Sequence, residues 1–301
     1  MVSLRNKIHK LINNAINRIQ YPIMELVYNR KCICVYGLFE KYGFWLKPNN
    51  IGDDLNIPYI EIMSGKRVVK ADYSYRVRNG KCISYSFIGS ILEKVCSKGH
   101  SSVVWGSGFK FSQNDLDDVS ILRNKYLAVR GPKTREIILA RGGECPAIYG
   151  DPVLLISKYI QIHVDKKYKI GLIPHRLEIK SPVINELQKD SSCHLINVTR
   201  YKHWINVLEE INECEVILSS SLHGLIIADS YKIPNLWVRF TDYTDGGGFK
   251  YEDYYGGICR EPKCLDLSSG FDLELIKSEL NKWTPPIINP EFEKSSPFFG
   301  H

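Results

Sequence analysis

The sequence predicts an α/β protein composed of two Rossmann-like domains that face a cleft. The chain has 301 residues, about twice the usual size of a domain. Short β-rich runs alternate with helical patterns, which is typical of βαβ units on a parallel sheet. This alternation starts again after a connector at residues 157–166. Because open parallel sheets bind ligands at the carboxyl ends of their strands, we expect the cleft there.

The first domain is expected to cover residues 31–156. Helical patterns in it follow Asp53, Ser90 and Pro132. Its predicted strands are residues 32–36, 67–70, 81–87, 102–105, 126–129 and 147–149.

The second domain is expected to cover residues 167–285, and a proline-rich stretch then leads into a tail, residues 286–301. We expect this tail to be extended and to wrap onto the first domain. The predicted strands of the second domain are residues 169–173, 194–198, 216–218 and 236–238, and its helical patterns lie near 180–190, 203–212 and 223–232.

Residues 1–30 predict a basic amphipathic helix. One face of this helix is apolar and the opposite face is basic, and no acid precedes Glu25 in the sequence. Two interpretations stay open: the apolar face packs across the body of the protein, or residues 4–28 form a peripheral contact with a membrane that holds a lipid-linked substrate. The apolar positions are Leu4, Ile8, Leu11, Ile12, Ala15 and Ile19, and the basic ones are Arg5, Lys7, Lys10 and Arg18.

Composition excludes several classes of protein. An apolar fraction of 44% and a charged fraction of 24% are ordinary for a globular chain. No apolar run approaches the ~20 residues that span a bilayer, and no signal-peptide core is present, so we expect a cytoplasmic protein, at most peripheral at the inner face of the membrane. The nine cysteines form no CxxC pair, and we therefore expect reduced thiols and no metal site.

The net charge of +7 favours an anionic partner. Aromatic residues do not interleave with the lysines and arginines as a stacking platform for bases would require, so we expect no nucleic-acid partner. An anionic small substrate and an anionic membrane surface both agree with this charge.

The most informative stretch runs from Glu215 to Asp229. A predicted strand leads into Ser219-Ser-Ser-Leu-His-Gly224, and a helical pattern follows. His223 is therefore expected in the first turn of a helix at a strand end, where unpaired N–H groups favour an anion such as phosphate. A histidine there could also donate a proton. The alternative is a capping cluster of serines with an incidental histidine.

Six motifs in this order resemble the polysaccharide pyruvyl transferase family over residues 32–240. The Ser-Leu-His-Gly unit and the later Tyr231-Lys-Ile-Pro-Asn235 resemble its S-x-x-LHG…A…G-x-P signature. The sequence departs from the family pattern at three places. Gly131 and Lys232 replace the family's usual acid and glycine, and the loop at 38–46 is longer and aromatic. The other five motifs are residues 50–54 (NIGDD), 89–92 (GSIL), 105–109 (WGSGF), 129–135 (VRGPKTR) and 150–152 (GDP).

The resemblance implies a transfer of an enolpyruvyl group from phosphoenolpyruvate to a sugar, closed into a ketal over two hydroxyls, without a cofactor. It also implies a fold similar to the GT-B glycosyltransferases. The acceptor would be a bacterial surface polysaccharide or its lipid-linked precursor. A nucleotide-sugar glycosyltransferase stays open as the alternative function, and a non-catalytic partner in polysaccharide assembly is a third.

Site residues follow from this resemblance together with the predicted strand ends. We expect His223 and Asp53 to act as general acid and base. Asp151 is expected to cap or brace the turn between the domains, with a catalytic role as the alternative. Residues 38–46 and 242–255 are expected to form either a lid over the acceptor or an exposed connector. The expected phosphoenolpyruvate-binding residues are Arg130, Lys133, Ser221, Gly224 and Arg239, and the expected acceptor-binding residues are Asn50, His175 and Tyr243.

Overall fold

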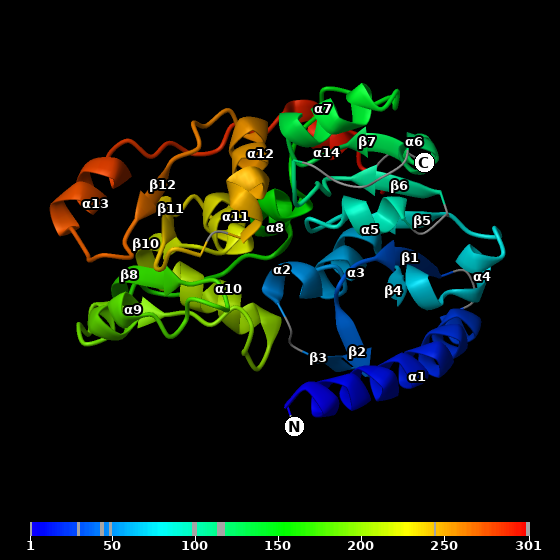
Figure 1. Ribbon diagram of the computed structural model, residues 1–301, viewed down its shortest axis with the longest axis horizontal. Helices are drawn as coiled ribbons and strands as arrows, with labels where there is room; N and C mark the ends of the chain where they lie inside the picture. Colours follow the sequence, from blue (N-terminus) through cyan, green and yellow to red (C-terminus); the bar gives the residue numbers. More distant parts are fainter. Residues whose placement is uncertain are drawn as a thin grey trace.

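The computed structural model describes residues 2–28, 31–42, 45–47, 50–97, 101–112, 118–243 and 245–298. The chain forms two lobes, each containing a five-stranded parallel sheet (Figure 1). The α/β class and the parallel strands predicted from the sequence are confirmed. The GT-B-like arrangement of the lobes stays a prediction.

The first lobe contains a sheet with the order β4-β1-β5-β6-β7. Its strands are β1 (Cys32–Tyr36), β4 (Arg67–Lys70), β5 (Ser84–Ser86), β6 (Ser102–Trp105) and β7 (Lys125–Ala128). The helical elements along this part of the chain are α2 (Ile51–Asp54), α3 (Pro58–Ser64), η1 (Ala71–Tyr73), α4 (Tyr75–Arg78), α5 (Leu92–Cys96), α6 (Asp118–Leu122), α7 (Pro132–Ala140), η2 (Pro152–Leu155) and α8 (Ile156–Tyr159).

The second lobe contains a sheet with the order β12-β11-β10-β8-β9. Its strands are β8 (Tyr168–Ile173), β9 (Cys193–Leu195), β10 (Cys214–Ser219), β11 (Asn235–Arg239) and β12 (Cys264–Asp266). The helical elements are α9 (Pro182–Leu187), α10 (Trp204–Asn212), α11 (Leu222–Ser230), η3 (Asp245–Gly248), α12 (Phe249–Gly257) and α13 (Leu273–Leu280).

The two sheets have the same topology. When the strands of each lobe are numbered from its N-terminal end, both sheets have the order 2-1-3-4-5. This is the doubly wound order of flavodoxin rather than the 3-2-1-4-5-6 order of dinucleotide-binding domains. In each sheet the strand order reverses at one point, between β1 and β5 in the first lobe and between β8 and β10 in the second. Ligands bind at such switch points, outside the carboxyl ends of the strands.

One predicted strand, residues 147–149, does not join the first sheet. Tyr149 makes a single isolated bridge with Val129. Pro146, which has no N–H to donate, and Gly150, with φ of 158°, flank the segment and limit it to this one bridge.

Helix α12 of the second lobe packs directly on the start of α7 in the first lobe. A Cβ on Gly131 would lie 1.7 Å from the carbonyl oxygen of Asp253, and one on Gly257 would lie 2.3 Å from the carbonyl oxygen of Arg130. The two backbones approach so closely that only glycine fits. This contact gives a physical reason for Gly131, the position that departs from the family pattern.

The expectation of a lid or exposed connector at residues 242–255 is wrong for its second half, which is helical. Phe249, Tyr251, Tyr254 and Tyr255 of α12 are buried. The aromatic side chains that suggested sugar stacking instead fill the core, because α12 is anchored between the lobes.

The C-terminal tail returns to the first lobe and contains a short helix, α14 (Pro290–Lys294), instead of being extended throughout. Phe292 stacks on Trp105, with ring centroids 4.7 Å apart. The indole N–H of Trp105 also donates to the carbonyl oxygen of Phe292 at 2.9 Å.

The N-terminal helix, α1 (Val2–Tyr28), lies along the first lobe (Figure 1). It packs through Asn17, Tyr21, Met24 and Glu25, which are buried. Residues of the predicted apolar face are exposed instead, with Leu11 at 68%. Within the described residues, the apolar face therefore does not pack on the body of the protein. Two short antiparallel strands, β2 (Glu40–Tyr42) and β3 (Trp45–Lys47), overlap the predicted loop at 38–46.

Candidate active site

A hollow of about 140 Å³ lies where the two switch points face each other. Most of its lining follows four strand ends, those of β1 and β5 in the first lobe and of β8 and β10 in the second, while Lys110 follows β6 and Lys250 lies on α12. Doubly wound topology thus explains why residues far apart in the sequence meet here. The lining residues are Leu38, Asn50, Asp53, Gly89, Ser90, Ile91, Lys110, His175, Ser221, Leu222, His223 and Lys250.

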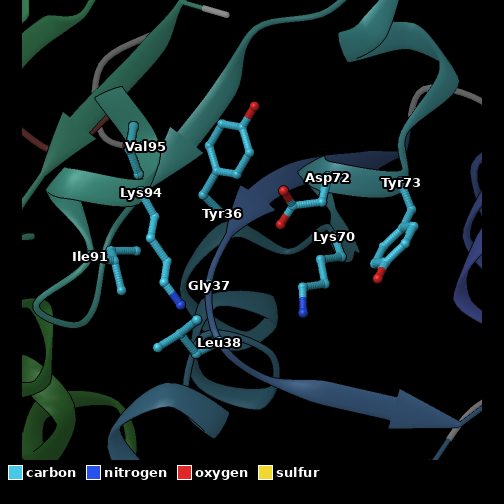
Figure 2. A pocket seen from close by; sticks show the side chains of 9 residues that line it. All are labelled: Tyr36, Gly37, Leu38, Lys70, Asp72, Tyr73, Ile91, Lys94 and Val95. Carbon is cyan, nitrogen blue, oxygen red and sulfur yellow. The ribbon is translucent and has the colours of Figure 1, made fainter. Parts of the chain in front are cut away.

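A second hollow of about 410 Å³ adjoins the first, and Leu38 and Ile91 line both. Figure 2 shows its polar side chains: Lys70, Asp72 and Tyr73 on one side and Lys94 of α5 on the other. The ammonium of Lys70 lies 5.9 Å from the ring centroid of Tyr73. The larger hollow therefore offers charged groups of both signs beside an aromatic ring.

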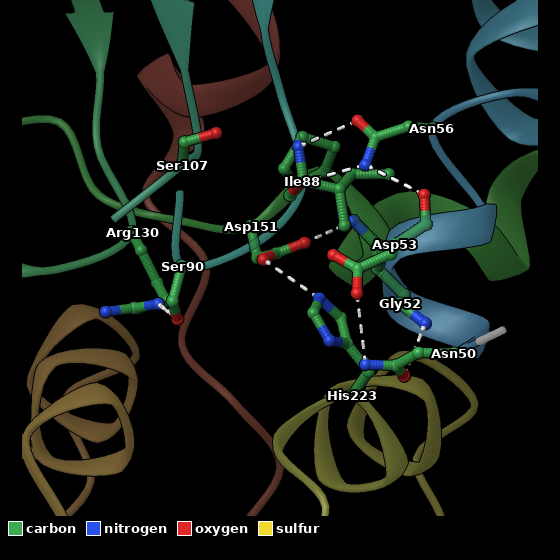
Figure 3. Close-up of polar contacts among 12 residues, drawn as sticks. Asn50, Gly52, Asp53, Asn56, Ile88, Ser90, Ser107, Arg130, Asp151 and His223 are labelled. Carbon is green, nitrogen blue, oxygen red and sulfur yellow. Dashed lines mark hydrogen bonds and ion pairs between the residues drawn. The ribbon is translucent and has the colours of Figure 1, made fainter. Parts of the chain in front are cut away.

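Asparagine side chains hold the first-lobe wall in place (Figure 3). Asn50 caps α2 and donates to the carboxylate of Asp53 at 3.2 Å. Asn56 donates to the Asp53 carbonyl oxygen at 3.1 Å and to that of Ile88, at the end of β5, at 3.0 Å. The N–H of Ile51 bonds across the cleft to Val198 at 2.9 Å. Asp53 is thus held at the junction of both lobes.

Burial and the neighbouring Asp54 raise the pKa of Asp53 to about 6, against the opposing attraction of Lys94 and Lys250. These two lysines line the larger and the smaller hollow, respectively. Asp53 therefore lies within electrostatic reach of both hollows. A carboxyl with this pKa is suited to general base chemistry near neutral pH.

Three serines shape the turn between β10 and α11. The Ser219 hydroxyl donates to the carbonyl oxygen of Ile173 at 3.0 Å, and the Ser220 hydroxyl accepts from the N–H of His175 at 2.8 Å. Ser221 is the N-cap residue of α11, but its side chain makes no capping hydrogen bond. The start of α11 therefore has no side-chain cap, and Ser221, Leu222 and His223 at this end of the helix line the hollow, an arrangement that favours an anion.

The imidazole of His223 lies directly against Gly52 of the opposite lobe. A Cβ on Gly52 would be only 1.9 Å from His223 Nδ1. Two sequence motifs, NIGDD of the first lobe and SSSLHG of the second, thus meet at one atomic contact. The glycine leaves the space that the histidine ring occupies.

Asp151 lies behind His223, at 3.8 Å between Oδ2 and Nε2 (Figure 3). The other carboxylate oxygen of Asp151 accepts the N–H of Val153 at 2.9 Å and caps η2, so the predicted cap is present. Among the described residues, Asp151 Oδ2 and His223 Nε2 are buried without a hydrogen-bond partner. Two facing polar atoms without partners inside a protein are costly, and a small closure would let them bond to each other.

Burial sets the protonation of this pair. It raises the pKa of Asp151 to about 7. Burial, together with the positive charges of Lys250 and Arg130, lowers the pKa of His223 to about 3. At neutral pH the imidazole is therefore uncharged, and the carboxyl behind it retains its proton to a much higher pH than an ordinary aspartate.

Two lysines make the hollow electropositive. Lys250 of α12 is 8% exposed, and its ammonium lies 5.1 Å from the ring centroid of Tyr251. Lys110 reaches the hollow from the turn after β6. The helix terminus and these lysines together suit a small ligand with more than one negative group.

Comparison with known proteins shows the family of this chain. The model of the family described as "Polysaccharide pyruvyl transferase" matches residues 6–241. The chain belongs to the polysaccharide pyruvyl transferase family. It is also 25% identical over 237 residues to the succinoglycan biosynthesis protein ExoV of Rhizobium meliloti (strain 1021), covering 76% of this chain and 69% of that protein. A match of 26% over 167 residues to an uncharacterized protein of Acanthamoeba polyphaga mimivirus covers 52% of this chain and about half (53%) of that protein.

Of the residues expected from the pyruvyl transferase resemblance, five line the hollow together: His223, Asp53, Ser221, Asn50 and His175. Their roles stay predictions. Four others lie elsewhere: Gly224, Lys133, Arg239 and Tyr243 are absent from its lining.

Each of these four has identifiable neighbours. Gly224 allows α11 to pack on the sheet, since a Cβ there would be 2.5 Å from Ser219 Oγ. Lys133 pairs with Glu252 at the contact between α7 and α12, and Arg239 pairs with Asp266. Tyr243 stacks on His175, with centroids 5.2 Å apart, and lines a small neighbouring hollow with Arg239.

Arg130 is 1% exposed and is bound by protein groups behind the hollow. Its Nε donates to Asp253 of α12 at 3.0 Å, and its two terminal nitrogens donate to the Ser90 hydroxyl and to the carbonyl oxygen of Phe109. Asp253 also accepts from the Thr134 N–H at 2.8 Å. In this structure Arg130 joins the two lobes and reaches the hollow only through Ser90.

The sequence did not identify Lys250, Lys110 or Ser90 as site residues. Lys110 directly follows the glycine turn Trp105–Phe109 at a predicted strand end, a signal that could have found it. Lys250 had no such signal, because its segment was interpreted as a lid or connector. Among the described residues no group of three or more His, Cys, Asp or Glu side chains is arranged to hold a metal ion.

Proposed function

We propose that this protein transfers a pyruvyl group from phosphoenolpyruvate to a sugar of a polysaccharide, or of its lipid-linked precursor, and closes it into a ketal without a metal or cofactor. One observation carries the proposal. The uncapped N-terminus of α11 opens on the same small hollow as Lys250, Lys110, Asp53 and His223. This is an anion site that also holds a candidate acid and base.

The donor carries a phosphate and a carboxylate, and the hollow can stabilise both. We assign the phosphate to the N–H groups at the start of α11 and to the neutral His223, which can donate one hydrogen bond. The lysines, Lys250 and Lys110, then neutralise the carboxylate. A neutral histidine avoids adding a third buried cation beside these two ammonium groups.

Ketal formation needs four proton movements: each of the two sugar hydroxyls loses a proton, and the methylene carbon and the leaving phosphate each gain one. The first sugar hydroxyl adds to the central carbon of the enol while the methylene carbon gains a proton and becomes a methyl group. The second hydroxyl then attacks the same carbon, and phosphate leaves with the remaining proton. Asp53 is the proposed base for the hydroxyls. His223 is the proposed acid, and the protonated Asp151 behind it supplies the proton that the neutral ring passes on.

The larger hollow is the proposed acceptor site. It adjoins the donor hollow, and Asp53 lies within electrostatic reach of Lys94 in its wall. Tyr73 offers a ring face for a sugar, and Asp72 and Lys70 offer hydrogen-bonding groups for hydroxyls. A sugar placed there would present its hydroxyls to Asp53.

Phosphate release from phosphoenolpyruvate tests the reaction. Purified protein is supplied with galactosyl, glucosyl and mannosyl acceptors in the presence of EDTA. We expect release that depends on an acceptor and survives the chelator. If no acceptor supports release, and a nucleoside diphosphate instead of phosphoenolpyruvate raises the melting temperature, the protein is a glycosyltransferase and the proposal is wrong.

Variants test the assignments. His223→Ala should lower turnover by about a hundredfold or more. Lys250→Met should mainly raise the KM for phosphoenolpyruvate, because it removes a charge from the donor site. Lys189→Met is the matched control, since Lys189 is exposed on the second lobe and pairs only with Glu186 among the contacts described there. Turnover of His223→Ala within a few-fold of wild type would remove His223 from the mechanism.

A further inference from the structure

Helix α1 exposes an unusually large apolar surface. Leu26 is 79% exposed, Val27 69% and Ile19 64%. Single exposed apolar side chains are common on proteins, but a contiguous group of this kind marks an interaction surface. We call this surface the α1 apolar face; its members are Leu11, Ile12, Ala15, Ile16, Ile19, Ile23, Leu26 and Val27.

The α1 apolar face is continuous. At 3.6 residues per turn its members and Pro22 fall within one arc of roughly 160°, and no polar residue between Leu11 and Val27 falls in that arc. The opposite arc holds the side chains that contact the first lobe. The exposed apolar side chains therefore form one continuous face of the helix.

Specific polar contacts fix the helix in this orientation. Glu25 accepts from the Ser74 hydroxyl at 2.7 Å and from the N–H of Tyr75 at 3.1 Å. The Tyr73 hydroxyl donates to Asn14 at 2.8 Å, and the Tyr21 and Tyr73 rings stack with centroids 5.7 Å apart. A rotation that buried the apolar face would break all of these contacts, so the face stays turned outward.

The exposed charges on α1 itself are positive. Glu25 is the only acid between residues 2 and 28, and it is buried against the first lobe. Arg18, at the border of the arc, is exposed. At the other end of α1, Val27 lines a hollow of about 490 Å³ whose charged residues are Lys31, Lys66 and the ion pair of Arg67 with Glu61. The exposed part of the helix thus combines apolar and cationic groups.

We propose that α1 docks this protein onto the surface of an anionic lipid bilayer, with the helix axis in the plane of the interface. A basic amphipathic helix with a wide apolar face is suited to that position. No helix among the described residues is long and apolar enough to span the bilayer. The inference goes beyond the transferase reaction and does not depend on it.

A second copy of the chain fits this face less well. Pairing two such helices would bring their basic residues together, and the one acid on the helix, Glu25, is buried and could not neutralise them. A regular helical pair also places charged partners beside its apolar seam, whereas Ala15, Gln20, Pro22 and Val27 occupy those flanking positions here. Charge complementarity therefore favours anionic lipid.

Vesicle flotation tests the inference with the full-length protein. Vesicles of phosphatidylcholine, with or without phosphatidylglycerol, are mixed with wild type and with the double variant Ile19→Ser, Ile23→Ser. The control is Leu273→Ser, Leu275→Ser on α13 of the other lobe, where the two leucines are 45% and 41% exposed. This control removes the same kind of exposed apolar side chain from a helix.

We expect wild type and control to float with the anionic vesicles. The affinity of the α1 variant for these vesicles should be lower by about tenfold or more. Arg18→Gln should weaken binding to anionic vesicles by about fivefold, and salt should weaken it further. Unchanged melting temperatures would show that the variants fold. Absence of flotation by wild type, equal flotation by the α1 variant, or a dimer in light scattering that this variant abolishes would each overturn the proposal.

Discussion

Replacing Gly52 by alanine would displace His223 without changing His223 itself. The added Cβ would lie 1.9 Å from Nδ1, whereas ordinary contact begins at 3.4 Å. The ring must therefore move by about 1.5 Å, the difference between those two distances. Its new position would disturb the approach of Nε2 to Asp151, so the substitution tests the contact between the two lobes.

The effect on stability has two opposing parts. Alanine in place of glycine within a helix favours folding by about 0.5–1 kcal/mol. Overpacking of a buried site costs about 1–3 kcal/mol. We expect Gly52→Ala to lower the free energy of unfolding by about 1 kcal/mol or slightly more. His223→Ala alone also destabilises, because it leaves a cavity at the same place.

The double variant Gly52→Ala, His223→Ala has room for the added methyl group. Its loss of stability should therefore be smaller than the sum of the two single losses, by about 1–3 kcal/mol. Urea unfolding of the four proteins measures this coupling, and phosphate release measures the matching loss of activity in Gly52→Ala. Additive losses, within about 0.5 kcal/mol, would refute the contact on which the candidate site is built.

Three further predictions concern the protonation and the anchoring of the site. Turnover should rise as Asp53 ionises through a pH of about 6 and fall as Asp151 loses its proton through about 7; a pH–rate profile whose falling limb is unchanged in Asp151→Asn would contradict the proton relay. Arg130→Met should cost about 3–5 kcal/mol, because it leaves Asp253 buried and unpaired, and urea unfolding should show recovery when Asp253→Leu is added. Phe292→Ala should cost about 3–5 kcal/mol by removing the ring stacked on the first lobe, and an unchanged denaturation midpoint would disprove that anchoring.

Local patterns predicted much of the fold. The run Cys32–Tyr36 and the run Ser102–Trp105 form strands with the predicted bounds, because buried parallel strands are continuous apolar segments that periodicity detects. The turn from β10 into α11, with His223 at its start, was also predicted from a strand, a serine cluster and a helical period. These signals lie within about ten residues of chain, which is why sequence analysis reached them.

Other features depended on contacts between distant segments. Periodicity identified α1 as amphipathic, but it assigned no partner to either face; the buried bonds of Glu25 decided which face turns outward. The glycine-rich segment before α12 carried the composition of a mobile loop. The residues that follow it nevertheless form α12, because the packing of this helix on Gly131 outweighs the local tendency of the segment to form a loop.

The sequence by itself determined the α/β class, the parallel strands, the position of the SSSLHG turn and, through its motifs, the pyruvyl transferase family. Only the tertiary structure decided that Gly52 makes room for His223, that Asp151 lies behind that ring, and that Lys250 faces the hollow while Arg130 is bound behind it. The physical reason is the separation along the chain of the residues that interact. Strand and helix patterns arise from neighbours along the chain, whereas burial, pKa and charge in the cleft arise from two sheets whose switch points meet across the lobes.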